Sequence, residues 1–176
     1  MNTWVALLRG INVGGRNILP MKDLRSLMEA QGFTDVKTYI QSGNIVFHSG
    51  SNDAATLSKQ IEEAIEQDFG FRPPVLTLSL DALNGAVEAN PYPDGDPKTV
   101  QFCFLFEPAP DTDLAALTAL STSSEEFALT NAVFYLHAPD GIGRSKLVAK
   151  MGKHIPVEMT VRNLRTVQKL QELASS

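Results

Sequence analysis

Two stretches near the N-terminus carry residues that could hold an anion or a nucleotide. The first reads LLRGINVGG and places Arg9 where an apolar run ends, followed by Asn12, Gly14 and Gly15. Glycines permit a close approach of the backbone, and successive N–H groups in such a loop favour anions. A tight structural turn is the alternative, because the stretch has neither the P-loop ending nor the GxGxxG spacing.

The second stretch reads TYIQSGN and contains Tyr39, Gln41, Ser42 and Asn44. A ring beside mixed hydrogen-bond donors and acceptors could bind a base or a sugar. The same residues fit the tip of a hairpin, where Gly43 and Asn44 tolerate left-handed backbone angles. The sequence leaves both interpretations open.

Basic residues near the C-terminus form a third candidate. Arg144 and Lys146 lie at the start of an expected short helix over residues 145–150, and Arg162 and Asn163 open an expected helix over residues 161–174. Cations in the first turn of a helix oppose its dipole, and a bound anion would remove this conflict. A solvated charged face is the alternative explanation.

Charge is unevenly distributed along the chain, whose net charge is −5. Residues 1–50 carry five basic and three acidic side chains, and residues 141–176 carry seven and two. Residues 51–140 carry three and fifteen. We therefore expect the two ends to meet in one positive cleft, where Arg9 and Arg162 bind a phosphate. Ordinary scatter of surface charge is the alternative.

The remaining chemistry-bearing residues indicate no further site. The three histidines lack metal-ligand spacing, so no metal site is predicted, and the sequence names no cofactor. Cys103 lies in an apolar run, where a buried and inert thiol is expected. A single cysteine excludes an internal disulfide and fits a reducing cytoplasm. No apolar run approaches 20 residues, so no membrane span is expected.

Secondary-structure signals place these residues on a β-α-β-β-α-β order that occurs twice. Leu24, Leu27 and Met28 recur at helical spacing, whereas Val36 and Ile40 alternate with polar residues as in a strand. The expected strands span 5–8, 36–41, 45–47, 75–80, 100–106, 127–130, 133–137 and 155–159. The expected helices span 20–31, with Pro20 at the first position, and 57–69, 82–89, 113–120, 145–150 and 161–174.

These signals predict an α+β fold of two ferredoxin-like β-α-β-β-α-β halves with an added C-terminal helix. The first half covers residues 1–80, and a connecting helix and loop cover 81–98. The second half and the terminal helix cover 99–176. The repeat lies in the order of elements and not in residue identities.

Three blocks, LLRGINVGG, TYIQSGN and TVRNLRTVQKL, resemble the signature of the bacterial domain-of-unknown-function family 1697. The blocks lie near both ends, so the resemblance covers essentially the whole chain. It implies a two-part α/β fold and supplies no agreed activity.

These features favour a cytoplasmic bacterial protein that binds a small phosphate-bearing, nucleotide-like ligand in a basic cleft between its halves. Short single-stranded nucleic acid is less favoured, because the net charge is acidic and an RNP-type aromatic pair is missing. One alternative is an enzyme acting on a phosphorylated or nucleotide substrate, with Arg and Lys stabilising phosphoryl charge. Another is a structural or interaction protein. Ligand identity, catalysis and oligomeric state are left open.

Overall fold

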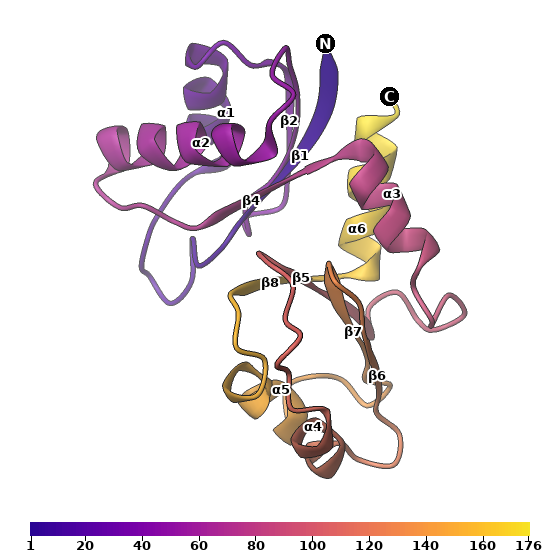
Figure 1. Cartoon of the computed structure of the whole chain (residues 1–176). Coiled ribbons are helices and arrows are strands. Elements are labelled where there is room, and N and C mark those ends of the chain that lie inside the picture. The colour runs from indigo at the N-terminus through magenta and orange to yellow at the C-terminus, as the bar shows by residue number, and fades with distance from the viewer. The chain divides into compact units, whose positions relative to one another are not determined.

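The computed structural model describes residues 1–176 (Figure 1). The chain forms two compact units. Unit 1 comprises Met1–Gly85 together with Gln168–Ser176, and unit 2 comprises Ala86–Val167. The boundaries fall within two helices, α3 (Leu80–Glu88) and α6 (Leu164–Ala174). Unit 1 is therefore discontinuous in sequence, whereas unit 2 is one continuous segment.

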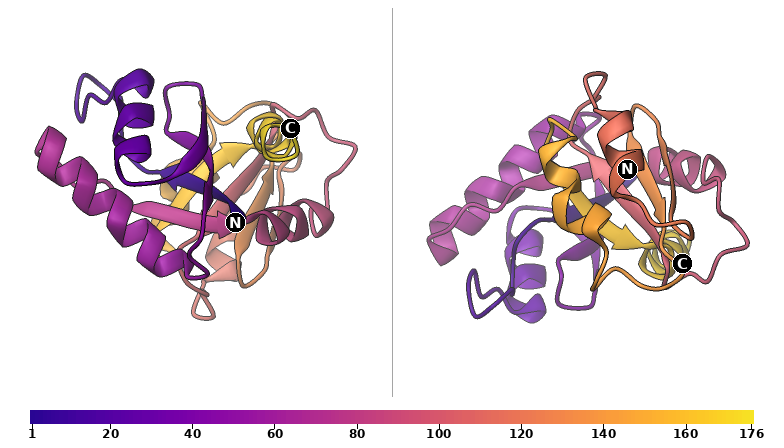
Figure 2. Two further views of the ribbon diagram at one scale, coloured as in Figure 1. Left: turned by 90° about the horizontal axis from the view of Figure 1, so that it is seen from above. Right: turned by 90° about the horizontal axis from the view of Figure 1, so that it is seen from below.

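Unit 1 contains a four-stranded antiparallel sheet in the order β2-β3-β1-β4. This is the strand order of a ferredoxin-like unit, as the sequence predicts. Its two crossover helices lie on the same side of the sheet (Figure 2). The elements are β1 (Asn2–Leu8), α1 (Met21–Ala30), β2 (Thr34–Tyr39), β3 (Asn44–Ser49), α2 (Ala54–Phe69) and β4 (Val75–Ser79).

The core of unit 1 follows the predicted periodicity. Helix α1 buries Leu24 and Met28, and α2 buries Ile61 and Ile65, against the face of the sheet that carries Trp4. The Asp53 side chain accepts a hydrogen bond from the Thr56 N–H and so caps the start of α2. Gly70 ends this helix in the left-handed conformation, at φ 77°, as expected for a C-terminal glycine.

The end of α6 belongs to unit 1 and is tied to it by hydrogen bonds. The Lys37 ammonium donates to the carbonyl oxygens of Leu173 and Ser176, at 3.2 and 3.1 Å. The Gln171 amide donates to the Asn84 side chain at 2.8 Å. A cation at the C-terminal end of a helix also complements the helix dipole.

Unit 2 repeats the topology with a second antiparallel sheet, ordered β6-β7-β5-β8. The predicted α+β fold of two similar halves is thus confirmed. The second crossover of unit 2 is short and ends in a 3-10 turn, η1. The elements are β5 (Val100–Leu105), α4 (Leu114–Leu120), β6 (Glu126–Leu129), β7 (Val133–His137), α5 (Lys146–Lys150), η1 (Met151–Lys153) and β8 (Met159–Asn163).

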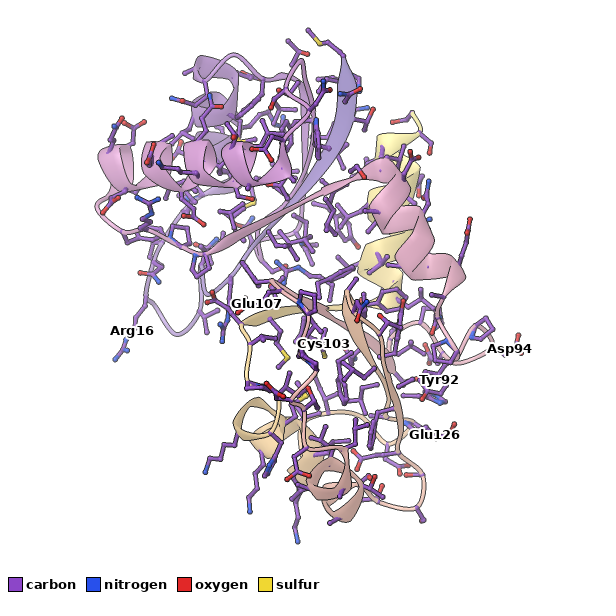
Figure 3. The ribbon with its side chains drawn as sticks, in the orientation of Figure 1. Arg16, Tyr92, Asp94, Cys103, Glu107 and Glu126 are labelled. Atoms are coloured by element: carbon purple, nitrogen blue, oxygen red, sulfur yellow. The ribbon has the colours of Figure 1, made fainter.

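Cys103 lies at the centre of β5 and is fully buried, as predicted (Figure 3). It packs in one apolar cluster with Phe134, Leu136 and Leu147. Burial raises the pKa of its thiol to about 12. The side chain therefore stays protonated at neutral pH, and thiolate is the form that reacts.

The last strand and helix differ from the prediction. The expected strand over 155–159 and helix from 161 are replaced by β8, and α6 begins only at Leu164. The Asn163 side chain accepts a hydrogen bond from the Thr166 N–H and caps this helix. Residues Thr160–Arg162 instead pair with β5. This long-range pairing outweighs the local helical signal.

Candidate functional site

The glycine-rich stretch after β1 forms a tight hairpin. Gly14 and Gly15 adopt φ values of +58° and +72°, and the Arg16 N–H donates to the Val13 carbonyl at 3.0 Å. Two successive left-handed residues define a type I′ turn, which explains the glycine pair. Figure 3 shows Arg16 at the end of this loop with its side chain pointing away from it.

Asn12 holds this loop in shape from the inside. Its amide nitrogen donates to the carbonyls of Leu19, at 2.9 Å, and Gln41, at 2.8 Å. Its oxygen accepts from the Leu19 N–H at 2.8 Å, so both ends of the side chain are already bonded. Asn12 therefore joins the loop to the turn after β2, and its predicted ligand-binding role stays a prediction.

The TYIQSGN block forms that turn, and its polar residues also act on the backbone. Asn44 is 0% exposed and donates to the Tyr39 carbonyl and the Ser42 hydroxyl, at 3.0 and 2.9 Å. Gly43 has φ +84°, and a Cβ added there would lie 2.7 Å from Leu8 Cβ. This part of the block follows the hairpin interpretation.

Helix α1 starts differently from the sequence expectation, which placed Pro20 at its first position. Pro20 takes the N-cap position with extended angles, and no side chain caps the helix. The first turn carries Asp23. A carboxylate at this place complements the helix dipole.

In unit 2, Ser145 initiates α5 and is committed to local bonds. Its hydroxyl accepts from the Val148 N–H at 3.1 Å and donates to the Glu125 carboxylate. Burial alone would raise the pKa of Glu125, but hydrogen bonds from Ser145 and Thr122 lower it. Glu125 was not anticipated from the sequence, because its partner lies 20 residues away.

Basic side chains on both sides of Ser145 are exposed. Arg144 and Lys146 are joined by Lys150 and Lys153 within ten residues, and none of the four is in an ion pair. The sequence analysis named the first two. The spacing of four from Lys146 to Lys150 is the signal that could have added the third.

Arg162 lies on β8 and is mostly buried. Its guanidinium donates to the Thr160 hydroxyl at 2.8 Å and the Val161 carbonyl at 2.9 Å. Burial lowers the pKa of Arg162 to about 10. The prediction that Arg162 and Asn163 open the last helix is corrected: Arg162 is a strand residue, and Asn163 caps the helix that follows.

The predicted site residues thus fall into groups. Those near the N-terminus lie in or beside two loops of unit 1 joined by Asn12, whereas Arg144 precedes α5 of unit 2 and Lys146 is its first residue. The hypothesis of a single anion-binding cleft formed with Arg9 and Arg162 stays a prediction. No group of three or more His, Cys, Asp or Glu side chains could hold a metal ion. None of the helices has the length and hydrophobicity needed to span a bilayer.

A cavity in unit 1 was not anticipated from the sequence. Its volume is about 400 Å³, and it lies where β1 begins and β4 meets α3. The indole N–H of Trp4, which forms part of the wall, has no hydrogen-bond partner. The lining residues are Met1, Asn2, Thr3, Trp4, Asn52, Ser79, Leu80 and Asp81.

Comparison with known proteins places the chain in a family. Residues 1–135 match the family described as "Protein of unknown function (DUF1697)", so the chain belongs to that family. The matched range contains the LLRGINVGG and TYIQSGN blocks and ends before TVRNLRTVQKL.

A solved structure with the same fold is that of a conserved bacterial protein, SP0830, from Streptococcus pneumoniae. It is 25% identical in sequence with a TM-score of 0.71, and the match covers 98% of each chain. No curated protein matches the chain. The family to which the chain belongs is thus one of unknown function, and the structural neighbour is a conserved bacterial protein.

Proposed function

We propose that this protein binds a small phosphate-bearing ligand of the nucleotide type through the basic surface of residues 144–153. This basic surface consists of Arg144, Lys146, Lys150 and Lys153. The observation that carries the proposal is that four exposed cations stand within ten residues without a carboxylate partner.

The basic surface contrasts with the acidic composition of the whole chain. Acidic side chains outnumber basic ones by 20 to 15. Some cations elsewhere in the chain are paired: Lys59 with Glu63, and Lys169 with Glu172 at 2.7 Å. Four cations left unpaired amid an excess of carboxylates repel one another, and a bound polyanion would relieve that repulsion.

The local structure favours a compact anion. Lys146 and Lys150 are four residues apart in α5 and so lie on one helical face. Arg144 precedes them and presents a planar fork that can bind phosphate oxygens in pairs. Ser145 is held by Glu125 and the helix backbone and serves as a fixed support between two of the cations.

Titration calorimetry with inorganic pyrophosphate and ATP tests the proposal. Replacing Lys146 and Lys150 together by glutamate should weaken binding at least about tenfold, or roughly 1.4 kcal/mol. The matched control is Lys98→Glu, which reverses an exposed, unpaired lysine of the same unit outside the basic surface.

Two results would contradict the proposal. One is the absence of binding of either phosphate compound by the intact protein. The other is an equal loss of affinity in the Lys98 control. A short single-stranded oligonucleotide serves as a third probe. Tighter binding of this polymer, with a steep dependence on salt, would indicate a nucleic acid as the ligand.

A further inference from the structure

The cavity in unit 1 is lined by side chains from one face of the sheet. Trp4 of β1 lies directly opposite Ser79 of β4, and Asn2 stands two residues before Trp4. Side chains paired across two strands, or two residues apart on one strand, point to the same face. This is the face that the helices cover, because the Thr77 hydroxyl accepts a hydrogen bond from Ser58 of α2 at 2.8 Å. Asn2, Trp4 and Ser79 therefore reach the cavity from the helical side of the sheet.

Trp4 brings an unsatisfied donor into the wall of the cavity. The residue is 6% exposed, and its indole N–H has no hydrogen-bond partner in the chain. A buried donor without an acceptor carries the cost of its lost hydration, and an acceptor supplied from outside the chain removes that cost. The cavity is therefore suited to a molecule that carries an acceptor oxygen.

Two further donors of the wall also lack an acceptor. The Ser79 hydroxyl accepts from the Ala82 N–H at 3.1 Å, but its own hydrogen has no acceptor within the chain. The Asn52 side-chain oxygen accepts from the Asn2 amide at 2.6 Å, which leaves the NH2 group of Asn52 without a partner. A carboxylate can accept several hydrogen bonds at once, so one such group could satisfy these donors together with the Trp4 N–H.

The wall has one charged side chain, that of Asp81. It lies in the first turn of α3 and forms no ion pair. An ammonium group beside this carboxylate would form a charge-assisted hydrogen bond. Leu80, which is half-buried in the same wall, offers an aliphatic surface. The cavity thus presents donors, one carboxylate and an apolar contact.

The size of the cavity restricts the class of ligand. Its volume of about 400 Å³ lies near the lower end of the range for small-molecule sites, roughly 300–1,000 Å³. A site of this size favours a small molecule over a polymer.

We propose that this cavity binds a free α-amino acid. The carboxylate of the ligand accepts hydrogen bonds from the Trp4 indole, the Ser79 hydroxyl and the Asn52 amide. Its ammonium pairs with Asp81, and its side chain lies against Leu80. The site belongs to unit 1 and is independent of the phosphate site proposed for the basic surface of unit 2.

The same observations disfavour two other classes of ligand. A phosphate compound would bring negative charge next to the carboxylate of Asp81, and no lysine, arginine or histidine lines the cavity to offset it. A neutral sugar could satisfy the donors, but it would leave the charge of Asp81 without a counterion. A molecule that carries an ammonium and a carboxylate matches both features.

The indole N–H resonance of the intact, ¹⁵N-labelled protein tests the proposal. The chain has one tryptophan, so this single signal reports on the wall of the cavity. The common amino acids are added one at a time at millimolar concentrations. At least one of them should move the indole signal downfield in a saturable manner, because the N–H gains an acceptor. The N-acetylated amide of that amino acid, which lacks both charges, should bind at least about tenfold more weakly.

Two variants examine the charge and the donor separately. Asp81→Asn should weaken binding of the same amino acid at least about tenfold, through the loss of the ion pair. Its matched control is Asp23→Asn, which changes another exposed aspartate in the first turn of a unit 1 helix and should bind as the wild type does. Trp4→Phe, measured by calorimetry, should also weaken binding while its melting temperature shows that the fold is kept.

Four results would overturn the proposal. One is an indole signal that no amino acid shifts, and a second is equally tight binding of the uncharged amide. A third is an equal loss of affinity in Asp81→Asn and Asp23→Asn. The last is an indole signal that moves with inorganic phosphate and not with amino acids, which would assign the cavity to an anion.

Discussion

The two units share one topology but differ in the loop that follows their first strand. In unit 1 this loop is residues 9–20, which carry two arginines and no acidic side chain. In unit 2 it is residues 106–113, which carry Glu107, Asp111 and Asp113 and no basic side chain. Equivalent positions in equivalent folds thus have opposite charge. The strand order is set by apolar patterns, and the connections are free to diverge.

The second crossover differs as well. In unit 1, α2 has 16 residues, and its Glu62 and Glu66 form ion pairs with Arg72. In unit 2, α5 has 5 residues, and the lysines of the basic surface have no acidic partner. Arg72 is thus neutralised within unit 1, whereas the cations of the basic surface have no carboxylate partner in unit 2. The comparison teaches that a function should be sought separately in each unit.

The largest expected effect concerns the turn between β2 and β3 in unit 1. Gly43→Ala should lower the free energy of unfolding by about 3 kcal/mol, since the new Cβ meets Leu8 and the backbone is left-handed. Gly141→Ala in unit 2 is the control, because it shares the positive φ but has open space. It should cost about 1 kcal/mol. Urea denaturation measures both, and equal losses would show that packing around Gly43 is unimportant.

A second contrast separates the arginines of the two units. Arg162→Ala should reduce the free energy of unfolding by about 2 kcal/mol, because its buried guanidinium donates to Thr160 and Val161. Arg16→Ala, at an exposed hairpin tip, should change it by less than about 0.5 kcal/mol. Thermal and urea denaturation report both values. A stable Arg162 variant would mean that the guanidinium contributes little to the fold.

Alkaline pH should lower the stability of the fold through Cys103, the sole cysteine, which lies in unit 2. Burial raises the pKa of Cys103 from 9.0 to about 12, so the stabilising contribution is complete below pH 9. Between pH 9 and 12 the unfolded chain releases this proton while the folded chain retains it, and stability falls as pH rises. At pH 10 the loss is about 1.4 kcal/mol.

The comparison with Cys103→Ala isolates this contribution from that of the lysines and tyrosines. The variant should be less stable at pH 7 because of the lost packing, yet its stability should fall less steeply above pH 9. Parallel curves for the two proteins would show that the thiol is accessible to solvent.

The smallest expected effect is an increase in stability. Ile40→Asn should raise the free energy of unfolding by roughly 0.5–1 kcal/mol, because asparagine accepts the left-handed angle that isoleucine resists. Ile142→Asn in unit 2 removes a comparable exposed side chain outside such a turn and should not be stabilising. Chemical denaturation of both variants decides whether the strain at Ile40 is real.

The sequence predicted the elements of both units well where short-range periodicity carries the signal. Leu57, Ile61 and Ile65 line one face of α2 as their spacing requires. It was wrong at Arg162, where a polar and charged run was assigned to a helix. That segment pairs with β5, about 60 residues earlier in the chain, and local spacing contains no information about this partner.

The candidate site was harder to predict than the fold. Asn12 and Asn44 were chosen because their side chains can bind a ligand, but both are used on nearby backbone. The type of a residue shows that its side chain can form hydrogen bonds, but it does not show where that side chain points in the fold. Conversely, Trp4 attracted no functional interpretation, because its unpartnered N–H and the cavity that it lines are properties of the fold alone.

The discontinuity of unit 1 has a consequence for biosynthesis. Residues 168–176 complete this unit through the contacts of Lys37 and Asn84 with the end of α6. On the ribosome they are added only after all of unit 2 has been made. The first sheet to be synthesised is thus the last to receive its full set of neighbours, and a nascent chain halted after residue 167 would carry a finished unit 2 beside an incomplete unit 1.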